Sequence, residues 1–206
     1  MNINIIVTCY NTEDHLSSLM KILDGFTKIK PIVCVAYSGS HENFPCDVRL
    51  QNTGDNSREL SMIVESMKWF KAKKVQSTRY LKLSAHVWPL NEDKLISIFE
   101  EMDKVRRPFA GNYWHHNFEG SLSADFFLLN TEYGNIFSNV TQVVNDTEVT
   151  IYQLLKGKNK NPYIIPGRDP VFWNNFFECK PLCLAMHPNL SDNLVLANEI
   201  KKEATV

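Results

Sequence analysis

The stretch IIVTCYNTEDHLSSLMKIL, residues 5–23, holds a strand, a turn and a helix in direct succession, and this order decides the fold class. It continues the short apolar run INIIVTC, residues 3–9, which is typical of a strand covered on both faces. NTEDHLSSLMKIL then supplies an Asn/Thr helix start, acids in the first turn and apolar residues at helical spacing. A buried strand that leads directly into an amphipathic helix predicts an α/β fold.

The same alternation recurs through the first half of the chain. We expect further strands at PIVCVAYS (31–38), DVRLQN (47–52) and RYLKLSA (79–85). Helices are predicted at NSRELSMIVESMKWFKA (56–72) and NEDKLISIFEEMDKV (91–105). This pattern predicts a mostly parallel, Rossmann-like central sheet flanked by helices, with its ligand at the carboxyl ends of the strands.

The pattern changes after about residue 108. Two strand-like segments, PFAGNYWHH (108–116) and SADFFLLN (123–130), lie close together, and TEVTIYQLLK (147–156) reads as a helix. With 206 residues and 44% hydrophobic content, the chain suits one domain, 1–206. We assign 1–107 to a nucleotide-binding half and 108–206 to an acceptor-side half. The sequence leaves open whether further domains belong to a longer polypeptide.

Composition narrows the classes of partner and compartment. Lys and Arg total 22 against 23 Asp and Glu, so no overall positive field would gather nucleic acid or anionic membrane. The first apolar run is too short for a signal peptide or a membrane-spanning helix. Five cysteines without zinc-like spacing favour free thiols in a reducing compartment. We therefore expect a soluble, cytoplasmic protein that neither binds nucleic acid nor inserts into a membrane.

Three motifs, in this order and spacing, resemble the GT-A fold glycosyltransferases. The first strand ends in Thr-Cys-Tyr-Asn before a helix, as the openings of that family do. YLKLSAHVWPLNEDKL (80–95) lies where the family places an Asp-x-Asp motif, and GSLSADFFLLNTE (120–132) resembles its acceptor-side strand. The likeness is greatest to the compact glycosyltransferase domains of large algal (chlorella) viruses. It implies hexosyl transfer from a nucleotide-diphosphate sugar, UDP-based, to a glycan or other hydroxyl acceptor, with inversion.

The positions that the resemblance assigns to the nucleotide lie at strand ends and in the loops after them: Thr8, Tyr10, Asn11, Ser38, Asn52, Gly54, Arg58, Ser84 and Ala85. The Tyr10 ring would stack on uracil, or alternatively would only close the core. Arg58 would reach the diphosphate from the first turns of its helix, or would be an ordinary surface charge. Ser38 stands where many relatives carry an acid for the base or ribose, which leaves base selectivity open.

Ser84-Ala85-His86 takes the place of Asp-x-Asp, where the family holds a divalent cation. An imidazole ligates manganese better than magnesium. The resemblance assigns a further metal ligand near the C-terminus, where His187 stands. A manganese site built from His86 and His187 competes with two alternatives: structural histidines, and metal-independent transfer in which Arg or Lys side chains carry the diphosphate charge.

Inverting transfer needs a carboxylate that accepts the proton of the acceptor hydroxyl. The resemblance favours Glu148 as this base, followed by Asp146 and Asp125. The alternative for Glu148 and Asp146 is that either is only a charge at a helix N-terminus, favoured there by the helix dipole. The aromatic residues predicted to pack against acceptor sugars are Trp88, Tyr113, Trp114 and Trp173.

Two other function classes remain open. One is a catalytically inactive module of this fold that binds sugar nucleotide or glycan. The other is a nucleotidyltransferase, which the glycine-free turn TCYNTED disfavours.

Overall fold

The computed structural model describes residues 1–10, 12–51, 58–75, 77, 79–113, 122–130, 137, 140, 147–156, 162–165, 185–186 and 198. Its elements follow one another as β1 (Asn2–Cys9), α1 (Glu13–Asp24), β2 (Lys30–Tyr37), β3 (Val48–Arg49), α2 (Arg58–Ala72), β4 (Arg79–Ser84), β5 (Trp88–Pro89), α3 (Glu92–Lys104), β6 (Phe109–Tyr113), β7 (Leu122–Asn130), α5 (Thr147–Lys156), β8 (Tyr163–Ile164) and β9 (Ala185–Met186). The predicted strands and helices are all present, although the third strand is only two residues long.

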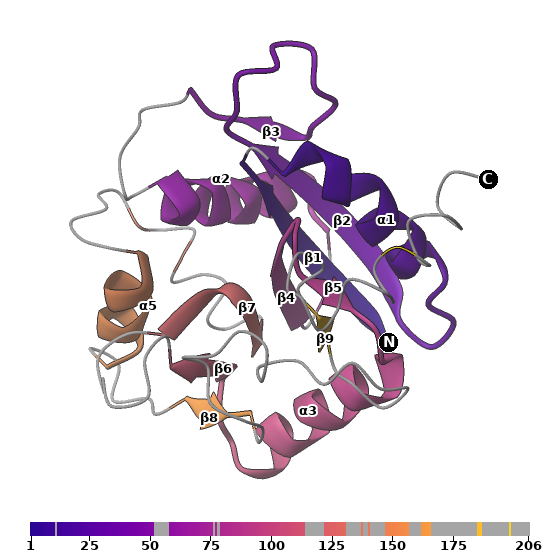
Figure 1. The fold of residues 1–206 in the computed structure, drawn as a ribbon. Coiled ribbons are helices and arrows are strands. Elements are labelled where there is room, and N and C mark those ends of the chain that lie inside the picture. Colours follow the sequence, from indigo (N-terminus) through magenta and orange to yellow (C-terminus); the bar gives the residue numbers. More distant parts are fainter. Residues whose placement is uncertain are drawn as a thin grey trace.

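The central sheet has the strand order β3-β2-β1-β4-β7-β6-β8 (Figure 1). Strands β3, β2, β1 and β4 are parallel, as the strand–helix alternation predicts. Strand β7 enters antiparallel beside β4, and β6 pairs antiparallel with β7. The expected mostly parallel α/β sheet is therefore confirmed for the first half, and an antiparallel pair joins it to the second half.

Helices cover both faces of the sheet (Figure 1). One apolar cluster joins α1 and α3 to alternate residues of β1, including Ile5 and Val7. The other joins α2 and α5 to the opposite face, where Ile6 of β1 and Tyr80 of β4 lie. Because side chains alternate along a strand, Thr8, Lys82 and Ser84 also belong to the face that α2 covers.

Both α3 and α1 have a polar residue at the N-cap position, but only one of the two side chains makes a capping hydrogen bond. Asn91 caps α3 through its side chain, which accepts a hydrogen bond from the Lys94 amide at 2.9 Å. Thr12 holds the equivalent position before α1, but its side chain makes no cap hydrogen bond. Of the helices that the structure describes, none is both long and apolar enough to cross a membrane.

Candidate functional site

The ends of three parallel strands meet at one edge of the sheet. The Ser38 amide donates to the Cys9 carbonyl at 3.1 Å, and the Ala85 amide donates to the Thr8 carbonyl at 2.8 Å. Open α/β sheets bind ligands at the carboxyl ends of such strands. The predicted convergence of the strand ends after β1, β2 and β4 is thus confirmed.

Tyr10 and Arg58 lie in contact at this edge. The Arg58 guanidinium carbon lies 3.6 Å from the centroid of the Tyr10 ring, which is cation–π geometry. Tyr10 follows β1 and is 36% exposed, whereas Arg58 opens α2. An aromatic surface and a fixed positive charge, predicted separately from the sequence, are therefore neighbours.

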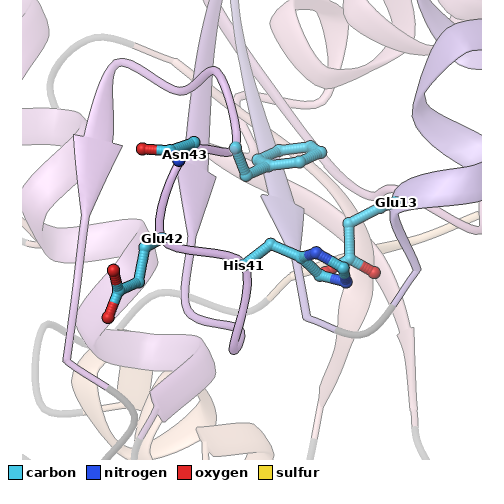
Figure 2. A pocket seen from close by; sticks show the side chains of 5 residues that line it. Glu13, His41, Glu42 and Asn43 are labelled. Atoms are coloured by element: carbon cyan, nitrogen blue, oxygen red, sulfur yellow. The ribbon is translucent and has the colours of Figure 1, made fainter.

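A pocket of about 360 Å³ opens between the start of α1 and the loop after β2 (Figure 2). It is lined by Glu13, His41, Glu42, Asn43 and Phe44. Since Glu13 follows β1 and the loop follows β2, the pocket belongs to the same edge of the sheet.

Tyr37 joins two of the residues that line this pocket, Glu13 and His41. Its hydroxyl donates to Glu13 Oε1 at 2.7 Å and accepts from the His41 amide at 2.9 Å. Its ring stacks on Phe44 with centroids 4.4 Å apart. A β-carbon at Gly39 would lie 2.2 Å from the Tyr37 hydroxyl oxygen, so this turn requires glycine.

A network of charged and hydroxyl groups lies between α2, β1, β4 and β7. Lys82 of β4 is fully buried, and its ammonium forms an ion pair with Glu59 of α2. Lys82 Nζ also donates to Ser84 Oγ at 2.9 Å, and Ser84 Oγ donates to Asp125 Oδ1 at 2.6 Å. The Thr8 hydroxyl completes the network by donating to Glu59 Oε1 at 2.7 Å. One cation thus serves two carboxylates, which come from different elements.

The outer side of this network is the pair His86 and Asp125. His86 Nε2 lies 3.5 Å from Asp125 Oδ1, and the two side chains are 24% and 17% exposed. Burial raises the pKa of the Asp125 carboxyl. The hydrogen bond with His86, the charges of Lys82 and His86, and the hydrogen bond from Ser84 outweigh that effect and hold the pKa well below its ordinary value. Asp125 is therefore held as an anion.

The described residues do not fit a divalent metal ion. No group of three or more His, Cys, Asp or Glu side chains among them is arranged to hold one. The carboxylates of Glu59 and Asp125 already share the Lys82 ammonium, directly for Glu59 and through the Ser84 hydroxyl for Asp125. A divalent cation placed among them would meet that positive charge at short range. His187, the other predicted manganese ligand, lies outside the described residues.

The prediction that Trp88 packs against an acceptor sugar is wrong for this structure. Trp88 is fully buried, and its ring meets His15 edge-on with centroids 6.0 Å apart. Strand β9 pairs with β5, where Trp88 stands opposite Met186. An aromatic ring enclosed by the core has no face left for a glycan.

Four predicted nucleotide contacts, Thr8, Ser38, Ser84 and Ala85, lie at the expected edge but are buried. Thr8 and Ser84 act within the charged network, so they orient Glu59 and Asp125. The Ser38 hydroxyl has no hydrogen-bond partner among the described parts of the chain.

The remaining predictions fall partly beyond the described residues. Those outside are Asn11, Asn52, Gly54, Trp114, Asp146 and Trp173, in addition to His187. Tyr113 lies in β6, where only its backbone is described. Glu148 lies half-buried in the first turn of α5, which packs against β7 and α2.

Sequence reasoning missed Glu59, Lys82 and the pocket after β2. Lys82 carried a readable signal, because a lysine between Leu81 and Leu83 in a strand covered on both faces must find a carboxylate. The partner Glu59 follows Arg58 directly, but the sequence does not show which strand it faces.

By sequence, no protein-family model matches the chain, and no curated protein does either. By structure, it is similar to a glycosyltransferase involved in glycosylation of the major capsid of PBCV-1, with TM-score 0.56, 10% identity and 98% of each chain covered. It is also similar to a cytidylyltransferase from Leptospira borgpetersenii serovar Hardjo-bovis, with TM-score 0.52 and 12% identity over 100% of this chain and 95% of the other.

A third similar structure is a CMP:2-keto-3-deoxy-manno-octonic acid synthetase complexed with CTP, with TM-score 0.51 and 11% identity over 82% of this chain and 93% of the other. These likenesses show a GT-A-like α/β fold, which glycosyltransferases and nucleotidyltransferases share. The expected fold is confirmed, and the chemistry has to be argued from the site.

Proposed function

We propose that this protein is a glycosyltransferase that moves a sugar from a UDP-sugar to a hydroxyl group of a glycan or similar acceptor, with inversion at the anomeric carbon. The observation that carries the proposal is the meeting of the Tyr10–Arg58 pair, the pocket after β2 and the charged network at one edge of the sheet. An aromatic face, a fixed cation and carboxylates are what a nucleoside diphosphate sugar needs for its base, diphosphate and hydroxyl groups.

The nucleoside would use the outer part of this edge. Uracil stacks on Tyr10, whose ring is already held by the Arg58 guanidinium. The ribose hydroxyls donate to the carboxylates of Glu13 and Glu42 in the neighbouring pocket. Arg58 lies close enough to Tyr10 that the same guanidinium can meet the diphosphate. Asn11, Asn52 and Gly54 complete this site in the proposal.

The transfer step breaks the bond between the anomeric carbon and the diphosphate oxygen. The electron pair of that bond leaves with UDP, and the acceptor oxygen forms the new bond from the opposite face. Glu148 takes the proton of the acceptor hydroxyl, with Asp146 as the alternative. Asp125 is the weaker candidate, because an anion stabilised by His86, Lys82 and Ser84 is a poor proton acceptor. Tyr113, Trp114 and Trp173 remain the proposed acceptor contacts.

A nucleotidyltransferase is the second candidate, since two of the similar structures belong to that class. It predicts a different product. A glycosyltransferase releases UDP from a UDP-sugar, whereas a nucleotidyltransferase releases pyrophosphate from a nucleoside triphosphate.

The test is product analysis by mass spectrometry after incubation with UDP-sugars, and separately with UTP or CTP plus acidic sugars and sugar phosphates. Release of UDP and free sugar, abolished by Glu148→Gln, supports the proposal. Pyrophosphate release would establish the second candidate. Binding of UDP without any turnover, in the presence of a panel of glycan acceptors, would make the protein an inactive binding module.

A further inference from the structure

Among the residues that the structure describes, Lys82 is a charged side chain that is fully buried. It lies in the middle of β4, is 0% exposed, and shares its face of the strand with the apolar core residue Tyr80. Burial of an ammonium group is costly unless the charge is paired and hydrogen-bonded. A lysine kept at this depth therefore has partners that depend on it.

The partners of Lys82 are the carboxylates at the candidate site. Glu59 forms the ion pair directly, and its side chain is 27% exposed. Asp125 is reached through the Ser84 hydroxyl, which accepts from Lys82 at 2.9 Å and donates to Asp125 at 2.6 Å. The buried ammonium thus serves two acids that are themselves partly exposed.

We propose that the Lys82 ammonium is a built-in cation that takes the place of a divalent metal ion at this edge, so that the protein binds a nucleoside diphosphate without metal. The proposal rests on the proposed function for the identity of the ligand. Lys82 acts as a positioning residue, because its buried charge works through Glu59 and Asp125 and does not itself touch the ligand.

Charge balance supports this role. Glu59 and Asp125 together carry two negative charges, which would repel a diphosphate. Lys82 cancels one of them from inside, and Arg58, whose guanidinium lies over the Tyr10 ring at the same edge, adds a second positive charge. The edge then accepts a diphosphate without recruiting a further cation, and the ammonium disfavours a divalent ion beside it.

Removal of the ammonium should change metal binding even without nucleotide. It leaves the carboxylates of Glu59 and Asp125 without the shared cation that repels a divalent ion. Lys82→Met should therefore bind manganese more tightly than the wild-type protein does.

The first experiment is titration with Mn²⁺ alone, followed by electron paramagnetic resonance of the free ion. We expect no binding by wild type up to millimolar Mn²⁺ and clear binding by Lys82→Met. Lys68→Met, which removes an exposed lysine of α2, is the matched control and should behave as wild type. Manganese binding by wild type, or a folded Lys82→Met variant that gains none, would overturn the inference.

The second experiment is calorimetric titration with UDP in chelator and in Mn²⁺. Wild-type affinity should be the same in both within about twofold, whereas Lys82→Met should bind about tenfold more weakly in chelator and recover in Mn²⁺. The double variant Lys82→Met/Glu59→Gln, which removes both charges of the pair, should recover part of the lost affinity without metal. A purely structural role of Lys82 predicts no rescue by Mn²⁺.

The two experiments distinguish failure of the proposed function from failure of the proposed role of Lys82. Absence of UDP binding in every condition would defeat the proposed function, while the manganese titration would still decide the role of Lys82. If Lys82→Met does not fold, the wild-type titrations and the charge-neutral double variant decide it: tighter UDP binding by wild type in Mn²⁺ than in chelator would refute the built-in cation.

Discussion

Replacement of Lys82 by Met tests how much the buried network contributes to stability. Met fills a similar volume but leaves Glu59 without its ion pair and Ser84 without one donor. Breaking a buried pair by removing one partner costs about 3–5 kcal/mol. Because the Glu59 side chain is 27% exposed and water can reach it, we expect the lower end, about 3 kcal/mol. For a chain of this size, that loss lowers the melting temperature by about 6–12 °C.

The assay is equilibrium unfolding in urea, followed by circular dichroism, for a double-mutant cycle of Lys82→Met and Glu59→Gln. If the two side chains form one charge pair, the double variant should be more stable than the sum of the single losses predicts, by about 1–3 kcal/mol. Lys68→Met breaks the exposed Lys68–Glu65 pair of α2, the helix that also carries Glu59. This change should lower the free energy of unfolding by less than about 1 kcal/mol. Strict additivity in the cycle, or a loss from Lys82→Met no larger than that from Lys68→Met, would refute the reasoning.

Three further predictions concern the proposed site. Tyr10→Ala should weaken UDP binding by about 1–3 kcal/mol in calorimetry, with Tyr10→Phe close to wild type; equal affinity of the Ala variant would remove Tyr10 from the base site. Glu148→Gln should lower kcat by about 10²–10⁴-fold in donor-to-acceptor transfer assays while UDP affinity stays constant; undiminished kcat would rule out Glu148 as base. The pKa of Asp125 is lower in the folded protein than in the unfolded chain, so its contribution to stability is present above about pH 4 and is lost as pH falls further. Asp125→Asn should therefore show a shallower loss of unfolding free energy between about pH 5 and pH 3 than wild type, and equal slopes would contradict the pairing.

Local sequence patterns were sufficient for most of the fold. The apolar runs at residues 3–9 and 31–38 and the helices after them predicted the parallel half, because burial on both faces leaves a direct signal in sequence. The insertion of β7 between β4 and β6 was beyond that reasoning. Pairing of Leu81 with Leu128 joins residues far apart in the chain, and no local pattern specifies the partner.

The candidate site was predictable only where its residues follow strand ends. Tyr10 and Arg58 were placed correctly at the edge, although their contact was not foreseen. The prediction for Trp88 was wrong because a tryptophan after a turn gives no sign that its segment will form a strand paired with residues 185–186 and that its ring will be buried. Lys82 was missed because the sequence does not show which carboxylate would pair with a single charged residue in an apolar strand. The structure identifies Glu59 as that partner.

The central claim is that a nucleoside diphosphate binds where β1, β2 and β4 end, and chemical-shift mapping tests it most directly. ¹⁵N-labelled protein titrated with UDP should show the largest amide shifts at Tyr10, Ser38 and Ala85. The amides of Arg79 and Asp103, an ion pair at the opposite edge of the sheet, should remain unchanged. Shifts centred on that opposite edge, or no saturable shifts at the strand ends, would contradict the account.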